Sequence, residues 1–548
     1  MWAHKGGRAM NIRETPDLAL PGPSSLVLAI IGAILAALVS KIVFREILRG
    51  RKQIRLPPGP PGEFLLGHYR TAPKDGAFKQ YAKWAKEYKS DVLFFETFGT
   101  RWIVLNSLKS AVELLEKRGS IYADRPRFVM FEEMGWSPTL TWLRWGPKYH
   151  LHRRVLQPPF VKSKVAQYAA MQRREALVCC KGMLDDPLKW VTSVRRFSVA
   201  VVLGIAYGLD VDGHSSPWIK LAEDSAEAVG KSGPPGSSIM DLWPSTRYLP
   251  EWLPFMERLR YAHTWRSAIQ RITKLPFKAS VRKMQNATPD RDVFVHNRLA
   301  IHAENTQKGL PNDFNIEDIK GAAATILIAG NDTTAATVTL LTLYLMQNPA
   351  VQRKAQDEID RVVGRDRLPS WDDIPQLQYA RLVLHETYRM NPLSPLGIPH
   401  ASVADDVYDG MLIPKGTVVY PNVWAMMHDE AVYARPFCFW PERYLSVEEG
   451  GNGEPLPVGN FGFGRRICIG RSLAENSLLI VLATMLATVE IQFPPGPDGK
   501  PAAFEPEWSF RGQAIVLPFK TSISSRTDKA RELLDAELCA LDKDAVTG

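Results

Sequence analysis

The stretch FGFGRRICIG, Phe461 to Gly470, holds one cysteine between glycines and next to two arginines. A reactive thiolate needs a lowered pKa, which nearby positive charge, backbone N–H groups or a helix N-terminus can supply. Gly464 and Gly470 let the backbone turn tightly around the sulfur of Cys468. The residues after Gly470 are typical of a helix, whose positive end would face the sulfur. An inert buried cysteine would need none of these features, so we expect Cys468 to be functional.

The cysteine count points to a reducing compartment. The chain has 548 residues and only five cysteines: Cys179, Cys180, Cys438, Cys468 and Cys539. An odd and small number argues against a disulfide framework. Cys468 is then either a redox-active thiol or an axial thiolate on haem iron, and the residues alone leave both open. A zinc site is disfavoured, because no second cysteine or histidine lies at ligand spacing.

The apolar periodicity predicts a mainly α fold with a small β-rich part near its start. Helical periodicity recurs around 76–88, 107–118, 150–180, 255–285 and 314–347, and strand-like runs lie at 91–98, 101–106, 417–423 and 513–519. We expect one catalytic domain over 63–520. A tail over 521–548 follows, with leucines at helical spacing that predict a short peripheral helix.

One expected helix runs from Asn315, a plausible N-cap, to Gln347, and is apolar nearly throughout. Its middle contains AGNDTT, which places Asp332 and Thr333 in an apolar setting. A buried carboxylate costs several kcal/mol unless it is paired or hydrated. Asp332 and Thr333 either satisfy local helix hydrogen bonds or, with Gly330, mark a widened turn that admits water or a small ligand. We favour the second interpretation.

A second motif predicts a buried ionic network. HETYR, His385 to Arg389, lies on an expected helix near 375–391, where Glu386 and Arg389 share one face and can pair. Arg443, in FWPERY, could join them. The role of this network would be structural.

The N-terminus predicts a membrane anchor. Residues 1–23 precede an apolar segment, 24–44, which is long enough for one helix across a bilayer of roughly 30 Å. A basic and Pro/Gly-rich hinge follows over 45–62, and positive charge stays on the cytosolic side. A signal peptide is the alternative, but the acidic residues before the segment and the basic ones after it argue against cleavage. The chain has a net charge of +10, but its sequence shows no basic stripe of the kind that is typical of nucleic-acid binding.

Together these motifs resemble the cytochrome P450 family. Phe461, Gly464, Arg466, Cys468 and Gly470 fit its FxxGxRxCxG haem loop. AGNDTT resembles the oxygen-activating stretch of the family's long central helix. Glu386, Arg389 and Arg443 resemble the family's structural triad. The anchor and LPPGPPG resemble the N-terminus of microsomal members. The resemblance covers residues 24 to about 520, and phrases such as EKRGSIYADRP look like fungal members of secondary or xenobiotic metabolism.

The resemblance implies roles for single residues. Cys468 would be the proximal ligand of haem b iron, and Asp332 and Thr333 would relay protons to bound oxygen. Arg466, His400, Arg125 and Arg153 would hold the haem propionates. The family usually has tryptophan four residues before Arg153, whereas this chain has Tyr149. Tyr149 can still donate through its hydroxyl, at a different reach.

The implied activity is that of a haem-thiolate monooxygenase in the endoplasmic reticulum membrane, with one transmembrane helix and a cytosolic catalytic domain. It would insert one atom of O2 into a hydrophobic small molecule: a terpenoid, steroid, polyketide or polycyclic aromatic. Its partners would be NADPH-cytochrome P450 reductase, cytochrome b5 and membrane lipid, with no nucleic acid. Two alternatives remain: an isomerase or dehydratase that does not activate O2, and a non-catalytic membrane haem protein.

Overall fold

The computed structural model describes residues 55–547 and two isolated positions, Gly32 and Ser40; within the range it leaves out Leu65, Lys74, Ser137, 234–237, 287–289, 497–503 and Arg511. The chain divides into a large unit, Pro57–Val407 with Ile413–Gly548, and a small unit, Met1–Leu56 with Tyr408–Leu412. In the small unit, Arg55 forms a parallel β-bridge with Met411. The expected anchor over 24–44 lies outside the described residues apart from Gly32 and Ser40, so the transmembrane helix stays a prediction.

Most of the large unit is helical, as the periodicity predicts. The helices are α2 (Ala77–Glu87), α3 (Leu108–Ala111), α4 (Gly119–Tyr122), α5 (Val129–Glu133), α6 (Pro147–Leu156), α7 (Ala169–Asp185), α8 (Trp190–Tyr207), α9 (Pro217–Gly230), α10 (Ile239–Leu242), α11 (Glu257–Asn286), α12 (Phe294–Gln307), α13 (Ile316–Gln347), α14 (Pro349–Val362), α15 (Gln378–Met390), α16 (Val423–Met427), α17 (Arg471–Thr488) and α18 (Asp528–Thr547). The shorter turns are the π-helical η1 (Val112–Lys117) and the 3-10 segments η2 (Pro158–Phe160), η3 (Val165–Tyr168), η4 (Pro187–Lys189), η5 (Pro244–Tyr248), η6 (Ile374–Gln376), η7 (Pro441–Tyr444) and η8 (Gly464–Arg466).

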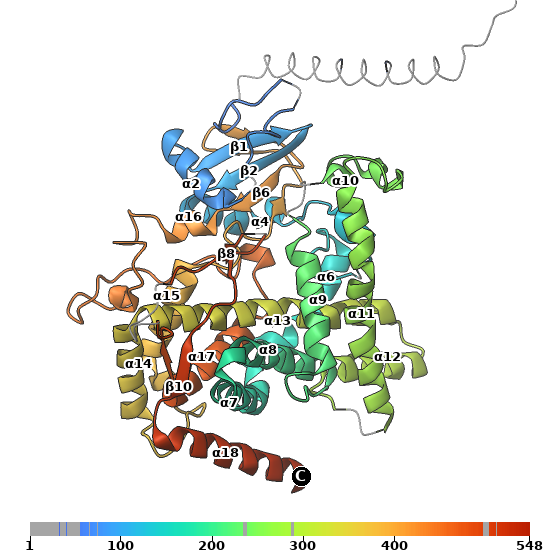
Figure 1. Cartoon of the computed structure of the whole chain (residues 1–548). Coiled ribbons are helices and arrows are strands. Elements are labelled where there is room, and N and C mark those ends of the chain that lie inside the picture. The colour runs from blue at the N-terminus through green and yellow to red at the C-terminus, as the bar shows by residue number, and fades with distance from the viewer. Residues whose placement is uncertain are drawn as a thin grey trace, which may run out of the picture. The chain divides into compact units, whose positions relative to one another are not determined.

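The β structure is small, as expected, but only β1 and β2 come from near the start of the chain; the other described strands follow residue 399, and two of them, β3 and β6, complete the sheet that β1 and β2 begin (Figure 1). The strands are β1 (Val92–Thr97), β2 (Thr100–Leu105), β3 (His400–Ala401), β4 (Asp406–Tyr408), β5 (Met411–Ile413), β6 (Val418–Pro421), β7 (Val489–Gln492), β8 (Trp508–Ser509), β9 (Ile515–Val516) and β10 (Ser522–Ser525). The largest sheet has the order β1-β2-β6-β3. Its β1–β2 pair is antiparallel and its β2–β6 pair is parallel.

Helix α13 runs through the core of the large unit (Figure 1). Asn315 caps it as predicted, because its side chain accepts a hydrogen bond from the backbone N–H of Asp318 at 2.8 Å. The helix ends before Pro349, which disfavours helical backbone in the residue ahead of it. A Cβ at Gly330 would stand 2.5 Å from Cγ1 of Val202, so this glycine lets α13 and α8 approach closely. Two described helical segments, Pro187–Tyr207 and α13, are long and apolar enough to span a membrane, but both are mostly buried in the protein.

Three expected elements differ in extent. The helix expected over 150–180 is two helices, α6 and α7, because Pro158 and Pro159 interrupt the chain and two 3-10 segments replace the helix there. The strand expected over 513–519 is reduced to the two residues of β9. The tail helix α18 is longer than expected, since Leu534 is fully buried against the core.

Candidate functional site

The cysteine lies in a short loop between η8 and the start of α17. The backbone N–H of Cys468 donates to the carbonyl of Phe461 at 2.8 Å, which closes the loop. Gly464 has φ +52°, and a Cβ there would stand 2.1 Å from the Leu115 carbonyl oxygen, so only glycine fits. Gly470 has an ordinary φ of −83°. A Cβ there would meet the Cys468 sulfur at 3.9 Å, an ordinary van der Waals contact, so this structure does not require glycine at position 470.

The charge around the sulfur differs from the expectation. Burial raises the pKa of Cys468. Three neighbours lower this pKa: Gly470 through its backbone N–H, Arg153 through its charge, and Arg471 through both its N–H and its charge. The two arginines of the FGFGRRICIG stretch, Arg465 and Arg466, are the neighbours in the chain expected to supply this positive charge. That assignment is wrong, because Arg466 turns to carbonyl groups elsewhere and Arg465 is exposed at the surface.

Two buried arginines lie beside the cysteine loop. Arg466 donates from Nε to the Ala123 carbonyl at 2.6 Å, and Arg125 donates from Nη1 to the carbonyls of Ile398 and Pro399, each at 2.7 Å. Burial lowers the pKa of Arg125 to about 9 and that of Arg466 to about 10. Neither side chain forms an ion pair with a carboxylate among the described residues. Such uncompensated buried cations favour a ligand that brings its own carboxylates.

His400 lies with these arginines but offers a different group. Its Nδ1 is 2.8 Å from the Tyr122 carbonyl, so this nitrogen carries the proton of the neutral ring. Burial, and next to it the charge of Arg125, hold the pKa of His400 well below its usual range. In this state Nε2 is an acceptor, and His400 can donate to a carboxylate only when that carboxylate's charge restores the second proton.

Helix α6 binds the cysteine loop from the other side. The Tyr149 hydroxyl donates to the Arg465 carbonyl at 2.7 Å, and Arg153 Nη1 donates to the Ile467 carbonyl at 2.7 Å. The guanidinium of Arg466 lies 3.7 Å from the centre of the Tyr149 ring. Tyr149 therefore supports the loop backbone and covers Arg466, and in this structure its hydroxyl is already engaged.

The donor set fits a haem with an iron–thiolate bond. The Cys468 sulfur lies deep inside the protein, yet its side chain remains accessible, so it faces an internal space and is not packed against neighbouring side chains. Among the described residues no group of three or more His, Cys, Asp or Glu side chains is placed to hold a metal ion. One sulfur beside buried, unpaired guanidinium groups suits a cofactor that supplies its own nitrogen ligands and carboxylates.

Asp332 and Thr333 lie together in the middle of α13. Burial raises the pKa of Asp332 to about 7, and the charge of Arg195 opposes this effect. The Thr333 hydroxyl donates to the Ala329 carbonyl at 2.9 Å, which is a bond within the helix. The helix is a regular α-helix throughout, so the widened turn expected here is not present; Gly330 instead serves the contact with α8.

Glu386, Arg389 and Arg443 form a fully buried network. Arg389 donates to both carboxylate oxygens of Glu386, at 2.8 and 2.9 Å, and Arg443 Nε donates to the same carboxylate at 3.1 Å. Their side chains have no exposed surface. Tyr444 and the backbone of Trp440 add two further donors to Glu386. The structure thus brings Arg443, the second arginine that the sequence suggested, into contact with Glu386.

Two residues near the cysteine loop, Arg471 and Trp145, were not among the residues that the sequence indicated. Arg471 begins α17, and its charge lies near the sulfur; its place directly after Gly470 was a signal for this. Trp145, which lies out of register with the family pattern, packs against Tyr149 with ring centres 5.1 Å apart and is within 6 Å of Arg465 and Arg466. Trp145 thus supplies aromatic surface next to the tyrosine.

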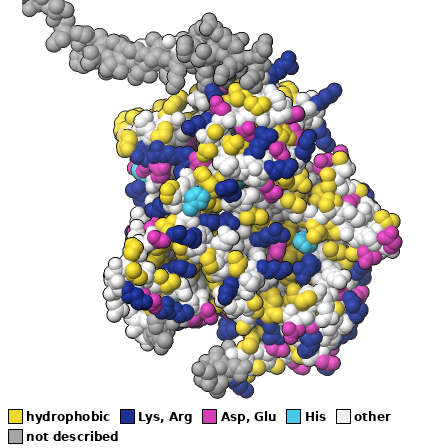
Figure 2. All heavy atoms as spheres, turned by 180° about the vertical axis from the view of Figure 1, so that it is seen from behind, with side chains coloured by type: hydrophobic (Ala, Val, Ile, Leu, Met, Phe, Trp, Pro, Cys, Tyr) yellow, Lys and Arg dark blue, Asp and Glu magenta, His cyan; other side chains and the backbone are white. Residues whose placement is uncertain are grey.

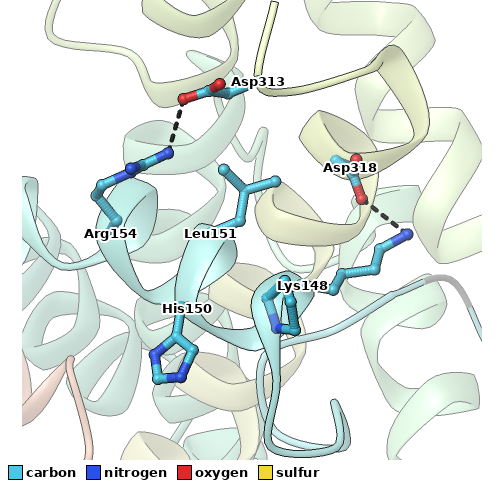
Figure 3. Close-up of a pocket in the computed structure, with 7 residues that line it drawn as sticks. Lys148, His150, Leu151, Arg154, Asp313 and Asp318 are labelled. Carbon is cyan, nitrogen blue, oxygen red and sulfur yellow. Dashed lines mark hydrogen bonds and ion pairs between the residues drawn. The ribbon is translucent and has the colours of Figure 1, made fainter.

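The outer face of α6 carries a surface pocket of about 500 Å³ (Figure 3). Arg154 pairs with Asp313 at 2.7 Å and Lys148 pairs with Asp318 at 3.1 Å on either side of Leu151. Tyr149 and Arg153, which bond to the cysteine loop, do not line it. This pocket is therefore separate from the cysteine site.

Comparisons with known proteins agree with the geometry. A family profile described as Cytochrome P450 matches residues 57–517. The chain is 34% identical over 508 residues to "Cytochrome P450 monooxygenase 208" of Postia placenta, which covers 91% of this chain and 96% of that protein. It is 33% identical to "Cytochrome P450 monooxygenase 105" of the same fungus over 95% of this chain and 99% of that protein. It is 32% identical to "Tryptamine 4-monooxygenase" of Psilocybe cyanescens over 87% of this chain and 93% of that protein.

Proposed function

This chain belongs to the cytochrome P450 family and is a P450 monooxygenase, and on that premise we propose that it oxidises a hydrophobic small molecule at a haem b held by Cys468. The observation that carries the proposal is the accessible Cys468 sulfur, deep in the protein and close to buried arginines that lack carboxylate partners. Haem iron bound to a thiolate supplies the activation of O2 and the transfer of one oxygen atom to substrate.

The residues of this chain would divide the remaining tasks. Cys468 holds the iron, while the N–H of Gly470 and the charges of Arg153 and Arg471 stabilise its thiolate. Arg125 and Arg466 bind the propionates, and Arg153 and Tyr149 fix the backbone of the cysteine loop. Asp332, whose pKa of about 7 lets it both hold and release a proton near neutral pH, delivers protons to the oxygen side with Thr333.

The substrate is a hydrophobic molecule of the terpenoid, steroid, polyketide or polycyclic aromatic class. Tryptamine 4-monooxygenase, a relative, is named for an aromatic amine, which supports including aromatic amines in a substrate panel. Residues 127–142 are only partly available for substrate, because Val129, Met130 and Met134 are fully buried in a core shared with α11. A panel of such compounds, incubated with the purified enzyme, reductase and NADPH, identifies the class.

The proposed setting is the endoplasmic reticulum membrane, with the catalytic domain in the cytosol. The apolar segment 24–44 and the basic residues after it support this orientation. Electrons would come from NADPH-cytochrome P450 reductase, with cytochrome b5 as an additional donor. Figure 2 shows Lys and Arg side chains spread over one face of the molecule, and the excess of ten positive charges favours acidic partners.

The assignment of the ligand is tested by spectroscopy. The reduced full-length protein with carbon monoxide should show the difference band characteristic of an iron–thiolate haem, and Cys468→Ser should abolish it. Cys539→Ser changes an exposed cysteine in the tail helix and should leave the band unchanged. A Cys468→Ser protein that keeps the band would refute the proposal.

A further inference from the structure

Ser198, Asn331 and Asp332 form a hydrogen-bonded network between α8 and the middle of α13. Ser198 Oγ donates to Asn331 Oδ1 at 3.2 Å, and Asn331 Nδ2 donates to Asp332 Oδ1, also at 3.2 Å. Ser198 is 1% exposed and Asn331 is 5% exposed. Gly330, the residue before Asn331, lets the two helices approach closely enough for this contact. The network therefore links the proposed proton carrier, Asp332, to a neighbouring helix.

The Ser198 hydroxyl has two acceptors within reach. Its oxygen lies 2.9 Å from the Arg195 carbonyl, one turn earlier on α8, and 3.2 Å from the Asn331 amide. A hydroxyl has one proton to donate and two lone pairs that accept. When its proton turns to the Arg195 carbonyl, the Ser198 oxygen is free to accept a hydrogen bond from Asn331. The same hydroxyl can thus be a donor or an acceptor toward this amide.

The Asn331 amide can reverse its role in the same place. An amide carries a donor NH2 and an acceptor oxygen, and a half-turn of the group exchanges the two with little change in shape. With its NH2 toward Asp332, the amide suits an ionised carboxylate, which only accepts. With its oxygen toward Asp332, the amide suits a protonated carboxyl, whose O–H donates, and its NH2 then donates to Ser198. Both arrangements use the same two side-chain contacts, so neither leaves the buried amide without partners.

Asp332 is placed to occupy both protonation states. Burial raises its pKa to about 7, and the charge of Arg195 acts in the opposite direction. Arg195 is half-exposed and pairs with Glu223 of α9 at 3.1 Å. At neutral pH the amide beside Asp332 must therefore meet a carboxylate in some molecules and a carboxylic acid in others.

We propose that Asn331 is a positioning residue whose amide turns over as Asp332 gains or loses its proton, with Ser198 as its partner on α8. On protonation, one proton binds to Asp332 Oδ1, the amide makes a half-turn, and the Ser198 proton swings from Asn331 to the Arg195 carbonyl. No other proton changes its atom, so the network takes up one proton and returns it by the reverse motion.

This inference rests on the proposed role of Asp332 in proton delivery. A neighbour that could only donate would favour the carboxylate, and one that could only accept would favour the acid. Asn331 can do either, so both states of Asp332 keep a hydrogen-bond partner. The proton is then trapped in neither state, which suits a group that must accept and release it in each cycle.

The test is pH-difference infrared spectroscopy of the ferric full-length holoenzyme, without NADPH or reductase. The carboxyl band of Asp332 is identified by its absence from Asp332→Asn. The amide carbonyl band of Asn331 is identified with isotope-labelled asparagine and by its absence from Asn331→Leu. We expect both bands to change with one midpoint, near pH 7, because the amide oxygen exchanges a hydroxyl donor for a carboxyl donor.

Asn331→Leu should also move the Asp332 midpoint. The carboxylate then loses a donor and the acid loses an acceptor, and hydrogen bonds to charged groups are the stronger kind. The ionised form therefore loses more, and the midpoint should rise by about one pH unit.

Two serine variants on α8 separate this switch from packing. Ser198→Ala removes one hydrogen bond from each arrangement, so it should shift the Asn331 amide band and leave the Asp332 midpoint close to that of the wild type. Ser193→Ala removes an equally buried hydroxyl of the same helix, which lies 3.0 Å from the His214 ring nitrogen. Its spectra should match those of the wild type.

An Asn331 band that stays unchanged while Asp332 titrates would make Asn331 a fixed contact between α13 and α8 and overturn the proposal. An unchanged Asp332 midpoint in Asn331→Leu, or the lack of any titrating Asp332 band, would overturn it as well. If Asn331→Leu does not fold, Ser198→Ala decides, because a labelled amide band that ignores this change excludes the switch. The measurement needs no turnover, so its failure is distinct from a failure of the proposed oxidation.

Discussion

Replacing Glu386 by glutamine should destabilise the protein strongly, although the change is nearly isosteric. The carboxylate accepts five hydrogen bonds: two from Arg389 and one each from Arg443, Tyr444 and the Trp440 backbone. Arg443 keeps a second carboxylate, that of Glu454, at 2.7 Å. Among the described residues, Glu386 is the only carboxylate paired with Arg389. Breaking a buried ion pair from one side costs about 3–5 kcal/mol, because it leaves an uncompensated charge.

The matched control is Glu317→Gln. Glu317 pairs with Lys320 at the same three-residue spacing on α13, but its side chain is 65% exposed. An exposed pair of this kind contributes about 1 kcal/mol or less, because water screens it. The two variants therefore remove the same kind of contact and differ in burial.

Both variants and the wild type are unfolded in urea at neutral pH, with circular dichroism and haem absorbance followed together. We expect Glu386→Gln to lose about 3–5 kcal/mol of the free energy of unfolding and Glu317→Gln about 1 kcal/mol or less. Glu386→Asp, which keeps the charge, should recover part of the loss. A Glu386→Gln protein within about 1 kcal/mol of the wild type would refute the account of the network.

Three other predictions concern the cofactor and proton machinery. The pKa of Asp332 is raised to about 7, so the folded state binds more protons than the unfolded state between about pH 4 and 7; the free energy of unfolding should fall as pH rises through this window. Asp332→Asn should remove this part of the slope in unfolding titrations, and an unchanged slope would contradict the burial of the carboxyl. Thr333→Ala should consume NADPH largely without forming product, and tight coupling in that variant would remove the relay role. Arg466→Gln should retain less haem per chain, by pyridine haemochrome assay, than Arg465→Gln at the exposed neighbour; equal haem content would contradict a propionate contact for Arg466.

Local patterns in the sequence predict many of the helices and most of the residue types found at the candidate site. The cap at Asn315 and the pair of Glu386 with Arg389 depend on atoms three residues apart in the chain. Helical geometry brings such positions together whatever the rest of the chain does. The same holds for Gly464, whose positive φ suits glycine.

Which arginine side chains lie near the Cys468 sulfur depends in part on contacts between segments that are distant in the chain. Arg153 meets a carbonyl 314 residues away, and Arg466 one that is 343 residues away. Of the two cations whose charge acts on the sulfur, Arg153 is distant in the chain, whereas Arg471 follows Cys468 closely. A side chain as long as arginine can reach several partners, and only the packing of distant segments selects among them.

The sequence by itself thus determined which chemical groups the protein has, through three short motifs: a cysteine among glycines, an acid and an alcohol in an apolar helix, and a glutamate and an arginine three residues apart. Burial decided how those groups behave. The shifted pKa of Asp332 comes from neighbours on other helices and loops, since the cost of a charge depends on the whole surrounding volume and not on the residues beside it in the chain.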